Sequence, residues 1–185
     1  LVASVGTSQM RSGKLGVGLA GTGSMLQCDF SQTNMKYGGG LSLSYSVTEY
    51  IGLRSTFLMD QMQFQYSGPL SGQLVPGNKY LMNVFSMNVY LSLDMMPSSS
   101  VNPFVVAGLG RAYFDGKGID GIADVTGSSW DLHMLVGGGL DVFMNEFLSA
   151  TVMGEYVVTG TDFLDGYKFG TAKDSYARIG FQVRY

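Results

Sequence analysis

The sequence predicts an all-β protein, a closed up-and-down barrel of eight antiparallel strands. Apolar and polar residues alternate with a period of two along most of the chain, which is typical of strands with one polar and one apolar face. These stretches are about 10 to 15 residues long, whereas globular strands usually have about 5 to 6. Short and long connections alternate along the chain, which indicates a meander of successive hairpins.

The last stretch of the chain shows the alternation clearly. Every second residue from Ala177 to Tyr185 is apolar, and Arg178, Gln182 and Arg184 lie between them. The same pattern predicts eight strands, at 14–25, 36–47, 50–62, 79–93, 103–114, 129–143, 147–158 and 175–185. Eight long antiparallel strands leave two unpaired edges unless they close, so we expect a barrel.

The connections fix the topology of the expected barrel. Tight turns are predicted at Thr48 and Glu49, at 97–102, and at Asn145 and Glu146. The longer polar segments, rich in Gly, Asp, Ser and Thr, are 26–35, 67–78, 115–128 and 159–174. Residues 1–185 are therefore expected to form a single domain with four longer loops at one end, preceded at 1–11 by a flexible N-terminal tail.

Composition excludes several classes of protein. Charged residues make up 14% of the chain against about 25% in soluble domains, and Gly accounts for 27 of 185 residues. Gly, Ser, Thr, Asn or a charge interrupts each apolar run, so no spanning helix is predicted. A net charge of −3 with scattered Lys and Arg argues against a nucleic-acid partner. The single cysteine, Cys28, excludes an internal disulfide and a thiolate zinc cluster.

The polar face of the strands suits the inside of a narrow barrel. It is mainly Gly, Ser, Thr and Ala, which leaves room for a few long charged side chains from other strands. The residues that we assign to a paired charge network in the lumen are Arg54, Asp60, Arg111, Asp131, His133, Asp141, Glu155, Arg178 and Arg184. An unpaired charge in such a space costs several kcal/mol, on the order of the penalty for a buried ion.

The apolar face then points outward, toward lipid, as in a transmembrane β-barrel. Such barrels carry aromatic girdles at both membrane interfaces. The residues predicted for these girdles are Tyr37, Phe114, Trp130 and Tyr156 near the loops, and Tyr45 and Phe104, together with Tyr185, near the tight turns.

Three tracts carry a resemblance to a known family. They are PFVVAGLG at 103–110, GGLDVFMNEFLS at 138–149 and the terminal RIGFQVRY at 178–185. The chain resembles the eight-stranded outer-membrane β-barrel family typified by OmpA and OmpX, clearly in its second half and by pattern in its first. The resemblance implies a Gram-negative outer membrane, short periplasmic turns, extracellular loops, and lipid and lipopolysaccharide as surroundings. It also implies that Phe181 and Tyr185 form the signal read by the barrel assembly machinery. Residues 1–11 do not show a charged start followed by an apolar run, so we expect that a signal peptide has been removed.

Motifs for other chemistry do not fit their context. Gly16, Gly18 and Gly21 match a dinucleotide-binding pattern, but they lie inside a strand rather than at a strand-to-helix junction. The segment 115–121 resembles a calcium loop only at Asp115. His133 is the only histidine and is predicted to face the lumen beside Asp131, away from lipid substrates. We therefore expect no catalytic residues, cofactor or metal.

The sequence thus predicts a non-enzymatic outer-membrane barrel with a polar, largely plugged lumen. We expect it to act as a surface or structural protein, or through its loops in an adhesion-type interaction with an extracellular partner. The alternatives are a narrow channel or small-molecule conduit, whose lumen charges would form a gate, a lipid A-modifying enzyme, and a soluble lipocalin-like carrier.

Overall fold

The structure is a computed structural model that describes residues 13–27, 31–66, 77, 79–118, 129–145, 147–160 and 175–185. These residues form one antiparallel sheet and include no helix, hence none long and apolar enough to cross a membrane. The strands are β1 (Leu15–Gln27), β2 (Ser31–Asn34), β3 (Lys36–Ser46), β4 (Ile51–Tyr66), β5 (Lys79–Asp94), β6 (Val101–Gly118), β7 (Ser129–Phe143), β8 (Ser149–Thr159) and β9 (Ser175–Arg184).

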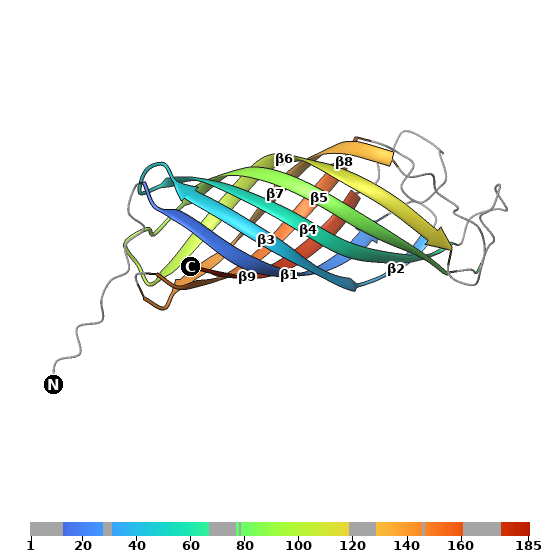
Figure 1. The fold of residues 1–185 in the computed structure, drawn as a ribbon, viewed down its shortest axis with the longest axis horizontal. Coiled ribbons are helices and arrows are strands. Elements are labelled where there is room, and N and C mark those ends of the chain that lie inside the picture. The colour runs from blue at the N-terminus through green and yellow to red at the C-terminus, as the bar shows by residue number, and fades with distance from the viewer. Residues whose placement is uncertain are drawn as a thin grey trace.

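The sheet closes on itself, which confirms the predicted eight-stranded barrel (Figure 1). Each strand pairs with its neighbour in sequence, and β1 pairs with β9 to close the ring. Strands β2 and β3 lie end to end along β4, with only Met35 between them, so they form one interrupted strand of the barrel. Closure pairs every long edge, which removes the surface on which another chain could add a strand.

Several strand ends differ from the prediction, and β4, for example, runs to Tyr66 rather than to 62. The segment 26–35 was expected to be a loop, but β2 lies within it and pairs with the far end of β4, at Tyr66. Strand β6 runs on to Gly118, four residues beyond the predicted end, because it follows β5 as far as Tyr80. Backbone pairing with a long neighbour therefore extends strands into polar sequence. The segments 67–76, 119–128 and 161–174, with Cys28 and the tail 1–11, lie outside the described residues.

Short turns connect the strands at one end of the barrel, which we call the turn end. The Thr48 hydroxyl accepts hydrogen bonds from the backbone N–H groups of Tyr50, at 3.2 Å, and Ile51, at 2.9 Å. The Asn145 carboxamide oxygen accepts two at 2.8 Å, from Phe147 and Leu148. Such side-chain bonds to the backbone are the reason that Thr and Asn favour turns. The opposite end, at the right of Figure 1, is called the loop end.

Side chains alternate between the lumen and an apolar outer wall. On β8, Thr151, Met153 and Glu155 are buried in the lumen. Val152 and Tyr156, at the alternate positions, are exposed. Leu, Val, Met and Ile side chains dominate the exposed positions on the other long strands as well. An outer wall of this kind is stable only against lipid, because it exposes far more contiguous apolar surface than water tolerates.

Strand β6 faces the opposite way from the prediction. Phe104 and Phe114, expected in the outer girdles, are 2% and 3% exposed and point into the lumen, while Arg111, expected in the lumen, is on the outer wall. The alternation was misleading here because both faces of β6 are apolar, so a period of two does not say which one is inside. The outward residues of β6 are Val101, Val105, Ala107, Leu109, Arg111 and Tyr113.

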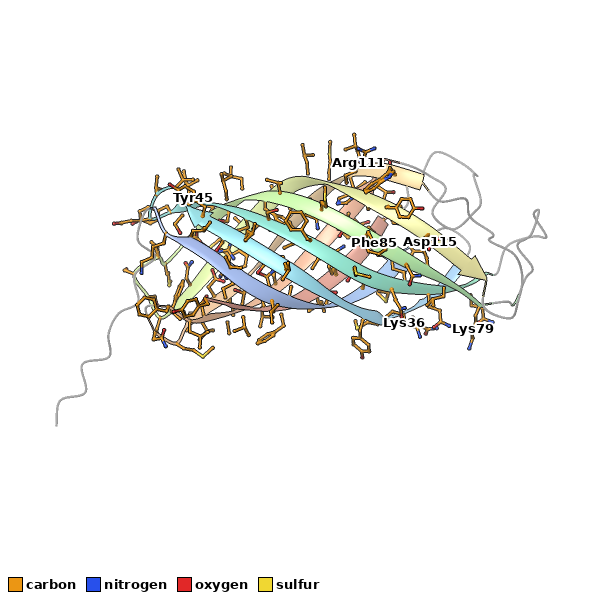
Figure 2. The ribbon with its side chains drawn as sticks, in the orientation of Figure 1. Lys36, Tyr45, Lys79, Phe85, Arg111 and Asp115 are labelled. Atoms are coloured by element: carbon orange, nitrogen blue, oxygen red, sulfur yellow. The ribbon has the colours of Figure 1, made fainter. Side chains whose placement is uncertain are left out.

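The remaining predicted girdle residues do lie on the outer wall. Tyr37, Trp130 and Tyr156 are exposed near the loop end, and Tyr113 lies 5.2 Å from Trp130, ring to ring, in the position expected of Phe114. At the turn end Tyr45 and Tyr185 are exposed, and the Tyr185 ring stacks on Phe147 at 6.1 Å (Tyr45 is labelled in Figure 2). Aromatic residues therefore occur at both ends of the apolar band.

The orientation of the two faces predicts opposite effects of substitutions in neighbouring strands. Val136→Arg should prevent folding into lipid vesicles, because Val136 is 58% exposed in the middle of β7 and a charge at mid-membrane costs about 2 to 4 kcal/mol. Thr151→Ser, which keeps the hydroxyl of a lumen residue, should fold as the unmodified chain does. The heat-dependent shift in gel mobility measures folding, and a folded Val136→Arg variant would show that this face does not meet lipid.

Candidate functional site in the barrel interior

The lumen accommodates long polar side chains because glycines on neighbouring strands leave them room. A Cβ atom on Gly38 would collide with the Asp60 carboxylate and backbone of β4. A Cβ on Gly110 would collide with the His133 ring and the Asn88 carboxamide. Small residues on one strand thus make space for large ones on the next, as the sequence predicted for a cramped interior.

A cluster of ion pairs fills the lumen near the turn end. It consists of Arg54, Asp94, Asn102, Asp141, Thr151 and Arg184, one residue from each strand from β4 to β9. The Arg54 guanidinium lies 2.7 Å from an Asp141 carboxylate oxygen and 3.1 Å from one of Asp94. Arg184 also pairs with Asp141. Two arginines therefore balance two carboxylates, and all four are at most 7% exposed.

Neutral groups complete this turn-end cluster. The Thr151 hydroxyl donates to Asp141 at 2.5 Å and accepts from Arg184 at 2.8 Å. The Asn102 amide donates to Asp94 at 2.9 Å. The Arg54 guanidinium carbon also lies 3.8 Å from the centre of the Phe104 ring. This cation–π contact explains why an aromatic residue of β6 faces inward.

A second cluster, the central cluster, is built around Arg178. Its guanidinium lies 2.7 Å from Glu155 and 3.0 Å from Asp60, and each of the three residues is at most 5% exposed. Glu155 and Arg178 are directly opposite each other on β8 and β9. Two carboxylates here share one guanidinium, so hydroxyl groups supply further hydrogen bonds to these carboxylates. Tyr90 donates to Glu155 at 2.7 Å, and Thr22 donates to Asp60.

His133 lies in the lumen as a buried, hydrogen-bonded side chain. It is 3% exposed, and its Nε2 atom lies 2.7 Å from the Asn88 carboxamide oxygen. Its ring meets the Tyr176 ring edge-on at 6.3 Å. No nucleophilic side chain is bonded to it among the contacts of the described residues, so the geometry offers no triad.

Apolar side chains close the lumen above the central cluster. Each of β1, β4, β5 and β9 has a polar inward residue, which is Ser24, Asp60, Ser86 and Arg178 in that order. The next inward residue toward the loop end, two positions along the strand, is apolar or aromatic in every case. These four residues are Leu26, Met62, Val84 and Tyr176. With Met82 and Phe114 they form part of one buried hydrophobic cluster, which we call the apolar layer. The lumen is therefore less polar than the sequence predicted.

The predicted lumen network is thus divided and incomplete. The structure brings together Arg54, Asp141 and Arg184 in one cluster, and Asp60, Glu155 and Arg178 in the other. Asp131 faces inward but lies half-buried at the loop end of β7 beside Gly160, and the bonds that define the clusters do not include it. Arg111 is outside the barrel. Asp94, Tyr90 and Tyr176 were missed.

A sequence signal existed for each of the missed residues. Asp94 continues the inward row of Ser86, Asn88, Tyr90 and Ser92 by the same period of two, one position beyond the predicted end of the strand. The inward row, which includes Tyr90, is thus polar over most of β5. Tyr176 likewise shares the inward row of β9 with Arg178.

The arrangement leaves little space for a ligand or for an ion path. A lumen cavity beside Arg54, Thr56, Tyr90 and Arg184 has a volume of about 10 Å³, enough for about one water molecule. Within the described residues no group of three His, Cys, Asp or Glu side chains could hold a metal ion. Chemically the interior is packed with side chains, and its charged groups are held in ion pairs and hydrogen bonds.

The sharing of Arg178 predicts unequal effects of removing its partners. Arg178→Met leaves both Asp60 and Glu155 buried in the lumen without their cation and should lower the free energy of unfolding by about 3 to 5 kcal/mol. Glu155→Gln leaves the Arg178–Asp60 pair intact and should cost less, about 1 to 3 kcal/mol. The double variant should lose less than the sum of the two single losses. Urea unfolding in lipid vesicles measures all three.

Arg111→Met, the same change on the outer wall, is the matched control and should shift stability by about 0.5 kcal/mol or less. Equal costs for Arg178→Met and Glu155→Gln would show that Asp60 does not depend on Arg178.

Comparison with known proteins agrees with this architecture. The structure superposes on OprG from Pseudomonas aeruginosa with a TM-score of 0.61 at 14% identity, covering 96% of this chain and 98% of OprG. Ail of Yersinia pestis, in complex with the heparin analogue sucrose octasulfate, gives 0.55 at 15%, covering 94% and 99%. Neisserial surface protein A gives 0.57 at 16%, covering 92% and 95%. At these identities the likeness shows the fold.

The sequence comparisons address the family itself. A search of curated proteins found no match. The family model described as the outer membrane protein beta-barrel domain matches residues 1–185. A closed barrel with an apolar outer wall, a plugged lumen and this match over the entire sequence together establish that the chain belongs to the outer membrane protein β-barrel domain family.

Proposed function

We propose that this outer-membrane barrel is a non-conducting, non-enzymatic surface protein that acts through the segments joining its strands at the loop end. The observation that supports the proposal is the filling of the lumen in three successive layers. They are the turn-end cluster, the central cluster and the apolar layer. An ion crossing the barrel would have to separate buried ion pairs and then pass a hydrophobic constriction.

The charge of the loop segments indicates the kind of partner. The segments 26–35, 67–78, 115–128 and 159–174 together contain seven aspartates and three lysines. Ail, which shares the fold, is an attachment invasion locus protein with a solved complex with a heparin analogue. A polyanion of that kind would be repelled by loops that are net acidic, so we propose a neutral or cationic protein surface as the partner here.

One observation favours the alternative of a gated channel. Arg178 is bonded to two carboxylates on different strands, so it could release one and keep the other while the lumen rearranges. This alternative requires the apolar layer to open as well, since Met62, Met82 and Tyr176 are each at most 1% exposed.

Conductance in planar lipid bilayers separates the two functions. The unmodified chain should give no regular current steps, because the charged side chains of both clusters are held in ion pairs and the buried apolar layer follows them in the lumen. Arg178→Met should stay silent too, since Tyr90, Met62 and Tyr176 still fill the lumen. Regular steps from the unmodified chain would favour the gated channel and refute the plug.

Loop replacement tests the surface role directly. Replacing 119–128 and 161–174 by Gly and Ser segments of equal length keeps every described strand and should abolish adhesion of expressing cells to epithelial monolayers. The matched control replaces only the five aspartates in these segments, Asp120, Asp124, Asp162, Asp165 and Asp174, by Asn and should reduce adhesion several-fold through charge alone. Undiminished adhesion after loop replacement would contradict the proposal.

A further inference from the structure

The outer wall contains a groove that the plugged lumen does not explain. It has a volume of about 510 Å³, in the range of small-molecule sites, and it runs across β3 to β7. Its lining is almost wholly apolar and includes Leu41, Phe57, Met59, Phe85, Met87 and Trp130. Gly39 and Gly40 line it on β3, and Gly39, which faces outward, leaves the wall low between the large side chains of the adjoining strands.

The groove lies where the apolar outer wall ends. On β4 and β5 the outward residues after Met59 and Phe85, toward the loop end, are Gln61 and Asn83, and their side chains are joined by a hydrogen bond of 3.3 Å. On β6 the apolar outward row stops at Leu109, and Arg111 follows. This change from apolar to polar side chains marks the interface between acyl chains and headgroups in a membrane barrel.

A positive charge borders the groove at this edge. The Arg111 guanidinium carbon lies 4.8 Å from the centre of the Trp130 ring, and Trp130 lines the groove. Figure 2 shows Arg111 projecting from the barrel and Phe85 on the face of the wall. Nearer the loop end, Asp115 follows Arg111 on the same face of β6, and Lys79 is exposed on β5. The groove therefore combines an apolar surface, on which a hydrocarbon chain can pack, with a positive charge beside its polar edge.

We propose that the groove binds one phosphate-bearing membrane lipid, with an acyl chain against Phe57, Phe85 and Met87 and the phosphate against Arg111. The apolar lining takes a hydrocarbon chain, and the guanidinium matches the geometry and charge of a phosphate. Trp130 holds the guanidinium in place by the cation–π contact and covers the chain below it. The site lies outside the barrel, so it is independent of whether the loops bind a partner.

Quenching of tryptophan fluorescence by brominated lipids reports on this site alone, because Trp130 is the only tryptophan of the chain. The full chain is reconstituted in phosphatidylcholine vesicles that contain increasing fractions of brominated phosphatidylglycerol or brominated phosphatidylcholine, with identical chains. The anionic lipid should be preferred about fivefold, which corresponds to about 1 kcal/mol for one basic residue near an anionic lipid headgroup. Equal quenching by the two lipids would overturn the proposal.

Substitutions separate the phosphate contact from general attraction of anionic lipid. Arg111→Gln should reduce the preference to about one, and Arg111→Lys should retain most of it. Lys14→Gln, which removes a charge at the turn end, is the matched control and should leave the preference unchanged. A preference that survives Arg111→Gln would overturn the assignment of the phosphate to Arg111.

A second pair of variants tests the groove itself. Met59→Phe narrows the groove and should lower the preference at least twofold, because the acyl chain loses its seat. Leu91→Phe makes a similar addition on the outer wall of β5, where Leu91 is 58% exposed and outside the groove, and should have no effect. If Met59→Phe behaved as Leu91→Phe does, the preference would come from surface charge alone and the site would be refuted. The gel-mobility shift verifies folding of each variant.

Discussion

Ion pairs between strands are the interaction on which the barrel interior depends. Arg54, Arg178 and Arg184 each reach a carboxylate on another strand, and these charges lie in a lumen too narrow to hydrate them. The pairs therefore have to be made as the barrel closes, and the turn-end cluster makes them across every strand from β4 to β9. Barrel closure and ion pairing therefore have to occur together, because a charge without its partner would be buried and unpaired.

The proposed function rests on the same narrow lumen. Under that proposal, a lumen filled by side chains leaves the loop end and the outer wall as the surfaces for recognition. The outer wall is uniform along most of its height, but it becomes specific at the groove, where Gly39 lowers the surface and Arg111 supplies a charge beside Trp130. Differences in side-chain size within the wall create this shape.

The sequence was most informative where the two faces of a strand differ in polarity. On β8 and β9 the inward rows carry Glu155, Arg178 and Arg184 and the outward rows are apolar, so the face of each of these residues could be predicted. On β6 both rows are apolar, and Phe104, Arg111 and Phe114 were placed on the wrong side. With two apolar rows, a period of two does not say which row faces lipid, and Arg111 lies on the outer wall, where it packs on Trp130.

The sequence by itself determined that the chain is all-β, that eight long strands close into a barrel and that the apolar face is outside, because these follow from a period of two, from strand length and from the scarcity of charge. Only the tertiary structure decided which carboxylate each arginine binds, that an apolar layer follows the central cluster in the lumen, and that a groove lies beside Arg111. Those features depend on the stagger between neighbouring strands, which sets the height at which side chains meet and which no local pattern along one strand encodes.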